Sequence, residues 1–146
     1  VATHRPRGNA APPRFARRDL PGHTGGLVIT EETGGRSCIF VPGCGALDDQ
    51  LLARFARVEL LLLDGTFWTE DELIRLGISD RRATQMGHLP VSGSGGSLEK
   101  LARLQNRRVY THINNSNPML VENSPERRAV EAAGVTVGDD GMLFTI

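Results

Sequence analysis

The feature that most constrains the fold is a run of four leucines at residues 60–63, preceded by Val58 and ended by Asp64. A half-exposed strand alternates apolar and polar residues, whereas a near-continuous apolar run is typical of a strand covered on both faces. The run is also far too short to cross a bilayer, which needs about 20 apolar residues. It therefore predicts a buried strand in a sheet that has helices packed against it.

Further elements alternate along the chain as an α/β layered domain requires. Strands are predicted at 26–30, 37–41 and 107–112, and helices at 48–57, 69–77, from Ser97 onward and 124–134. Thr69 and Ser124 are expected to cap their helices, and Pro125 suits a first helical position. Residues 135–137 and 142–146 are expected to close the chain as a hairpin around Gly138-Asp-Asp-Gly141.

Composition divides the chain into a short extension and one domain. Residues 1–19 carry five Arg and three Pro with little apolar periodicity, which indicates a disordered or misassigned extension, and residues 20–146 form the predicted domain. Acidic and basic residues balance at 17 each, so neither nucleic acid nor an anionic membrane is expected as a partner. Two cysteines do not make a disulfide framework, which favours the cytoplasm as the location.

Two polar residues stand where predicted strands end. Asp64 closes the leucine run, and His112 closes the strand at 107–112. In open α/β sheets ligands bind at the carboxyl ends of the strands, so parallel neighbours would bring the two side chains to one edge. An imidazole and a carboxylate suit zinc, iron or manganese. The structural alternatives are a turn or capping aspartate and a loop-capping histidine.

Other candidates lie in loops. His88, in a Gly/Ser-rich loop, suits a proton donor, a substrate contact or a third ligand, or else a plain surface histidine. Asn114, Asn115 and Asn117 follow His112 and offer amide groups to ligands or substrate. Cys44 lies in a Pro-Gly-Cys-Gly turn, where a buried small residue is favoured over a site thiol.

Several segments resemble, in the same order, blocks of the pyrroloquinoline quinone (PQQ) biosynthesis protein B (PqqB) family. These segments are Phe40-Val-Pro-Gly-Cys-Gly-Ala-Leu47, Leu63-Asp-Gly-Thr-Phe-Trp68, Met86-Gly-His-Leu-Pro-Val-Ser-Gly93, His112-Ile-Asn-Asn-Ser-Asn-Pro118 and Ser124-Pro-Glu-Arg127. The resemblance covers residues 20–146 and implies the C-terminal half of a metallo-β-lactamase αββα sandwich. It implies that Asp64 and His112 are metal ligands and that His88, beside the metal, is either an outer contact of the ligands or a catalytic group. It also implies that His88, Asn114 and Asn115 line the substrate pocket.

The resemblance also implies what is missing. The superfamily's HxHxDH-like cluster does not occur in these 146 residues. Since catalytic metal sites use at least three protein ligands, the chain alone is expected to bind metal weakly and to be inactive. It is also expected to expose a sheet face and edge, which favours aggregation or a homodimer.

The implied role is the synthesis of PQQ, with ferrous iron or zinc as the metal. One form of that role is an iron-dependent oxygenase that hydroxylates the tyrosine of the PQQ precursor peptide. Another is a cytosolic carrier of PQQ or a precursor on its way to the periplasm. A third alternative is an inactive, truncated remnant of a longer protein.

Overall fold

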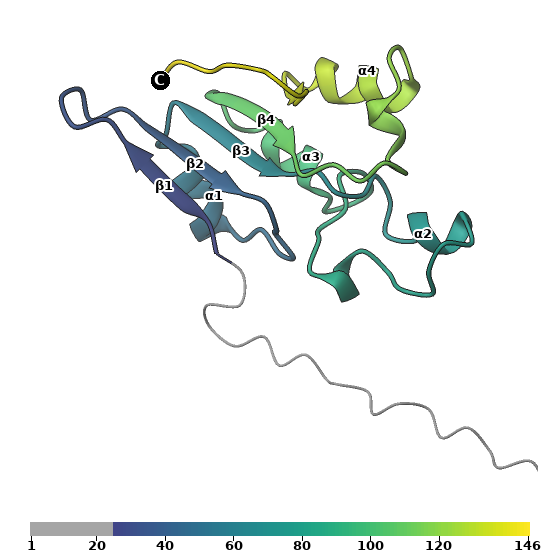
Figure 1. Cartoon of the computed structure of the whole chain (residues 1–146). Helices are drawn as coiled ribbons and strands as arrows, with labels where there is room; N and C mark the ends of the chain where they lie inside the picture. The colour runs from purple at the N-terminus through teal and green to yellow at the C-terminus, as the bar shows by residue number, and fades with distance from the viewer. Residues whose placement is uncertain (1–24) are drawn as a thin grey trace, which may run out of the picture.

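A computed structural model describes residues 25–146, and the strands of this part of the chain form one mixed five-stranded sheet. The strands are β1 (Leu27–Thr30), β2 (Ser37–Val41), β3 (Leu60–Asp64), β4 (Arg107–Thr111) and β5 (Thr136–Val137), and they lie side by side in chain order. β1 runs antiparallel to β2, while β2 to β5 are all parallel (Figure 1). The extension predicted at 1–19 lies outside the described residues.

Short helices connect the parallel strands. They are α1 (Asp49–Phe55), α2 (Glu72–Arg75), α3 (Ser97–Leu101) and α4 (Pro125–Ala132), with 3-10 turns η1 (Thr84–Met86) and η2 (Pro118–Leu120). Ser124 caps α4 as predicted, since its hydroxyl accepts a hydrogen bond from the backbone N–H of Arg127 at 2.9 Å. The predicted cap at Thr69 is wrong. The carbonyl of Thr69 closes a turn by accepting from the N–H of Glu72, and α2 begins after Asp71 instead.

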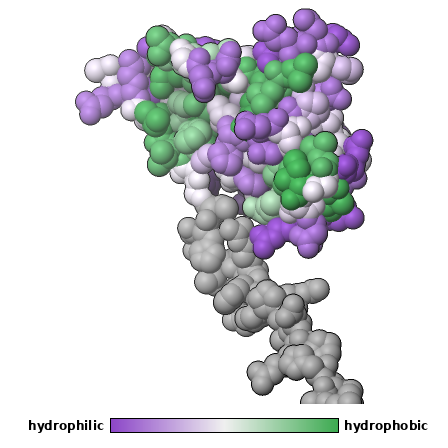
Figure 2. All heavy atoms as spheres, turned by 45° about the vertical axis from the view of Figure 1, so that its right-hand side comes forward, coloured by the Kyte–Doolittle hydropathy of each residue, from purple (hydrophilic) through white to green (hydrophobic). Residues whose placement is uncertain are grey.

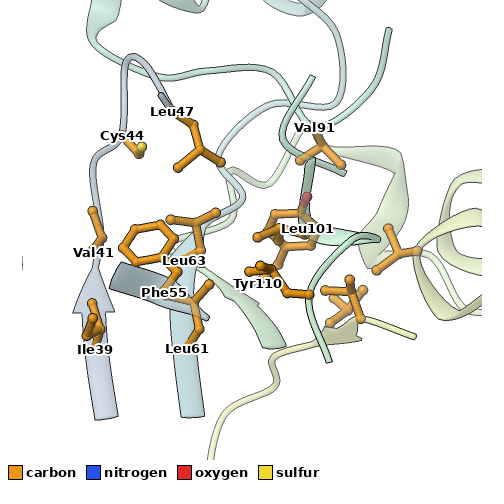
Figure 3. Close-up of a cluster of buried hydrophobic side chains, with 14 of the residues drawn as sticks. Ile39, Val41, Cys44, Leu47, Phe55, Leu61, Leu63, Val91, Leu101 and Tyr110 are labelled. Atoms are coloured by element: carbon orange, nitrogen blue, oxygen red, sulfur yellow. The ribbon is translucent and has the colours of Figure 1, made fainter. Parts of the chain in front are cut away.

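The main core lies between one face of the sheet and helices α1, α3 and α4. Side chains from the middle strands, among them Val41, Leu63 and Tyr110, pack there with Phe55 of α1 and Leu101 of α3 (Figure 3). A smaller cluster on the opposite face is formed by Cys38, Leu60 and Val109, with Leu62, Phe144 and Ile146 packed against it. The leucine run is thus divided between two apolar clusters, which confirms that β3 is covered on both faces.

The predicted C-terminal hairpin is wrong. β5 pairs in parallel with β4, and the residues after Gly141 form no strand. The tail instead runs over the second face of the sheet, where Phe144 and Ile146 contact the smaller cluster and the guanidinium of Arg107 lies 5.5 Å from the ring of Phe144. Burying these apolar side chains is worth more than the bonds of a short two-stranded hairpin. Among the described residues, no helix is long and apolar enough to span a bilayer.

Candidate metal centre

The carboxyl ends of β3 and β4 bring Asp64 and His112 together, as the strand pattern predicts. The strands are parallel neighbours in which Asp64 pairs with Thr111, so the next residue, His112, emerges at the same edge. Its Nδ1 lies 3.8 Å from Oδ1 of Asp64. His88, from the loop after η1, places its Nδ1 2.7 Å from Oδ2 of the same carboxylate. One ligand atom from each of the three residues lies within 4.8 Å of the other two.

Asp64 is the anchor of the cluster. Its side chain is 1% exposed, so its charge must be compensated locally. Oδ2 accepts from the backbone N–H of Cys44 at 2.8 Å, and Oδ1 accepts from the backbone N–H of Thr66 at 3.0 Å and from the Thr66 hydroxyl at 2.5 Å. These donors fix both oxygens, and the carboxylate therefore keeps one orientation toward the two imidazoles.

The two imidazoles differ in exposure. Their rings stack with centroids 5.4 Å apart and an interplanar angle of 22°, and the ring of Phe67 contacts His88 edge-on. The side chain of His88 is 17% exposed, whereas that of His112 is 52% exposed. His112 also has a φ of 53°, in the left-handed region that residues other than Gly seldom occupy. The site is therefore walled on the His88 side and open to solvent on the His112 side.

Thr66 lies at the middle of the cluster, a role that its place in the sequence does not predict. Its Oγ1 lies 2.8 Å from Nδ1 of His112 and 3.1 Å from Nδ1 of His88, in addition to its bond with Asp64. Gly65 makes this approach feasible. A Cβ there would lie 2.8 Å from Met119 and 2.9 Å from Tyr110, so only glycine lets β3 turn this closely. The signal in the sequence is the glycine between an aspartate and a hydroxyl residue.

The asparagines after His112 lie on the loop at the mouth of the site. The side chain of Asn114 donates to the hydroxyl of Ser116 at 2.5 Å, and that hydroxyl donates to the buried carboxylate of Glu72, also at 2.5 Å. Asn115 is exposed to solvent. Asn117, the third asparagine after His112, is buried and donates to the carbonyl of Gly65, which gives it a structural task. The substrate role of Asn114 and Asn115 remains a prediction.

The donor set fits a transition metal. Two imidazoles and one carboxylate at one edge match the ligands that zinc uses in catalytic sites and that ferrous iron uses in a two-histidine, one-carboxylate arrangement. The hydrogen bonds that hold Asp64 are the kind of outer contact that orients a ligating carboxylate. The open side at His112 leaves room for a further ligand.

Comparisons with known proteins identify the family of the chain. The family described as "Beta-lactamase superfamily domain" matches residues 3–113. The coenzyme PQQ synthesis protein B of Azoarcus sp. (strain BH72) is 45% identical over 140 residues, which cover 93% of this chain and 46% of that protein. The protein of the same name from Methylobacterium nodulans is 51% identical over 116 residues, which cover 79% of this chain and 39% of that protein.

A solved structure gives the same result. The crystal structure of Zn²⁺-bound PqqB from Methylobacterium extorquens matches with a TM-score of 0.77 at 42% identity, covering 83% of this chain and 43% of that one. The chain spans about half the length of the relatives it matches, or less. The α/β fold of the metallo-β-lactamase type, expected from the resemblance, is confirmed. The chain belongs to the beta-lactamase superfamily and, within it, to the family of the coenzyme PQQ synthesis B proteins.

Proposed function

We propose that the protein containing this chain acts in PQQ biosynthesis, and that its metal site supports hydroxylation of the tyrosine of the PQQ precursor peptide. The observation that carries the proposal is the convergence of Asp64, His88 and His112 at the carboxyl edge of the sheet. The names of its relatives supply the pathway. We further propose the cytoplasm as the location and the precursor peptide, or an intermediate made from it, as the partner.

The residues at the site have distinct proposed roles. Asp64 and His112 hold the metal, and ferrous iron in a histidine and carboxylate site supplies oxygen-activating chemistry. His88, hydrogen-bonded to Asp64 through Nδ1, holds a proton on the walled side of the site. Asn114 and Asn115 offer amide groups to the substrate from the exposed loop beside His112.

A carrier of PQQ or of a precursor is the second candidate. It is favoured by the zinc in the related structure, because zinc has no redox chemistry and cannot activate oxygen by electron transfer. A carrier needs the metal's affinity for oxygen or nitrogen donors, but no turnover. The two candidates therefore differ in oxygen consumption and share their dependence on the metal centre.

Metal analysis and turnover test the proposal. In this chain, Asp64→Asn and His112→Ala should abolish even the weak binding of added iron or zinc, whereas His88→Ala should leave the binding near that of the unchanged chain. The matched control is Asp80→Asn, an exposed aspartate in the loop after α2. Equal metal loss in the His88 variant would instead make His88 a third ligand.

Turnover is measured in a full-length family member that carries the corresponding changes. The hydroxylase proposal expects oxygen consumption with the precursor peptide, lost in all three variants. Tight binding of the product without oxygen consumption would contradict it and support the carrier.

A further inference from the structure

We propose that the hydroxyl of Thr66 is the positioning group of the metal centre, setting the Asp64 carboxylate and the His112 imidazole in their ligating arrangement. This inference rests on the proposed metal centre and deepens it. Thr66 is buried and stands two residues after Asp64, at the turn by which β3 leaves the sheet. It touches all three of the candidate donor residues.

The Thr66 hydroxyl has one proton to donate and several possible acceptors nearby. Two neighbours can only accept it: Oδ1 of Asp64 at 2.5 Å and the backbone carbonyl of His112 at 2.9 Å. The carboxylate contact is the shorter and is charge-assisted, so the proton goes to Asp64. The oxygen lone pairs of Thr66 then remain to accept from a ring nitrogen.

The direction of the Thr66 hydrogen bond determines the tautomer of the His112 imidazole. The Nδ1 of His112, 2.8 Å from the Thr66 oxygen, is best placed to donate to it. A proton on Nδ1 leaves Nε2 of His112 with its lone pair free, which is the form in which an imidazole binds a metal. A hydrogen bond to the other ring nitrogen is the usual device that orients a ligating histidine.

The same residue also clamps the loop that carries His112. The backbone carbonyl of Thr66 accepts from the N–H of Asn114 at 3.0 Å, and its side chain lies against the carbonyl of His112. His112 has a left-handed backbone, which is unfavourable for an L-residue and needs surrounding contacts to persist. Thr66 supplies such contacts on both sides of His112.

Three variants test the hydroxyl. Thr66→Val removes it with little change of shape, Thr66→Ser keeps it, and Thr66→Ala removes it should the valine variant fail to fold. The matched control is Thr111→Val, because the Thr111 hydroxyl donates to the carbonyl of Leu63 at 3.4 Å and makes none of the bonds described for Thr66.

The first measurement needs no metal. Long-range ¹H–¹⁵N spectra of the metal-free chain at about pH 8, where an ordinary imidazole is neutral, report which ring nitrogen carries the proton. We expect the His112 proton on Nδ1 in the unchanged chain and in the Ser and Thr111 variants, and a shift toward Nε2 in the Val and Ala variants. The same tautomer in all variants would overturn the proposal.

The second measurement is Co²⁺ binding, followed by visible absorption. Loss of an outer-contact partner typically weakens metal binding by about 10–100-fold, and we expect that loss for Thr66→Val with rescue by Thr66→Ser. Unchanged affinity and an unchanged spectrum in the valine variant would overturn the proposal. Because the chain alone is expected to bind metal weakly, the titration extends to a large excess of Co²⁺. If the unchanged chain binds no Co²⁺ even then, the proposed metal centre is wrong, and the nitrogen spectra still decide the role of the hydroxyl.

Discussion

At the scale of single residues, the surroundings of Cys44 decide between its two sequence-based interpretations. Its side chain is buried, and its thiol donates to the carbonyl of Ala46 at 3.1 Å. Burial, followed by the negative charge of Asp64, raises the pKa of the thiol from 9.0 to about 11. A thiol held neutral in this way is a poor nucleophile. Its backbone N–H, which donates to Asp64, is the part of Cys44 that serves the site.

The raised pKa of Cys44 predicts a loss of stability in alkali. The pKa of the Cys44 thiol is higher in the folded chain than in the unfolded one. Its contribution to the free energy of unfolding is therefore fully present below pH 9 and is lost as the pH rises toward 11. A shift of this size corresponds to about 2–3 kcal/mol of unfolding free energy. Urea unfolding from pH 8 upward should show a steeper decline for the unchanged chain than for Cys44→Ala. Parallel declines in the two proteins would contradict the prediction.

The residues of the site were predictable to different degrees. Asp64 and His112 follow from strand ends, because parallel pairing alone carries two such positions to one edge. Their convergence is confirmed, while their role as ligands remains a proposal. Thr66 was not predicted, because a hydroxyl residue in a turn is common, and its importance appears only when Gly65 allows β3 to pass within van der Waals distance of Tyr110 and Met119.

At the scale of elements, Arg108 of β4 connects the ends of two helices. Its guanidinium donates to the carbonyl of Leu101, the last residue of α3, at 2.7 Å and to that of Leu104 in the following turn at 2.6 Å. It also donates to the carbonyl of Gly134, after α4, at 3.0 Å. Carbonyls at helix ends lack partners within the helix, and a cation there also meets the negative end of the helix dipole. One side chain thus ties both helices to the sheet.

We expect Arg108→Met to be strongly destabilising. Removing the guanidinium takes the donor from the part-buried carbonyl of Leu104 and one of two donors from that of Leu101, which should cost about 2–4 kcal/mol of unfolding free energy. The matched control is Arg103→Met, because Arg103 makes an exposed ion pair with Glu99 that should contribute less than about 1 kcal/mol. Urea midpoints measure both. A similar midpoint for the two variants would show that Arg108 does not hold the helices.

The helices and strands were predicted correctly from the sequence where the local residue pattern agrees with the burial in the fold. The apolar run of β3 and the Ser124-Pro125 start of α4 are both confirmed. The prediction of a C-terminal hairpin was wrong because a glycine turn between two short apolar segments is a purely local signal. The competing term, packing of Phe144 and Ile146 on Leu60 and Val109, depends on residues about 40 to 80 positions away.

At the scale of the whole molecule, the second face of the sheet is only partly covered. Leu27 and Ile29 of β1 pair with Phe40 and Cys38 and therefore extend the face on which the smaller cluster lies. They are 62% and 56% exposed, and β1 is an edge strand of the sheet, with no strand among residues 25–146 paired to its outer side. Figure 2 shows hydrophobic side chains gathered in separate patches between hydrophilic areas. Exposed apolar surface next to an open strand edge favours association.

We therefore expect the 146-residue chain to self-associate through β1. Sedimentation velocity from about 5 to about 200 μM should show a rising weight-average mass, as expected for exposed apolar strand edges. The double variant Leu27→Ser, Ile29→Thr should shift the chain to monomer at little cost in stability, since both side chains are largely exposed in the single chain. The matched control Leu143→Ser removes an exposed leucine from the tail and should associate like the unchanged chain. An unchanged chain that stays monomeric throughout, or a double variant that associates as strongly, would show that this face does not drive association.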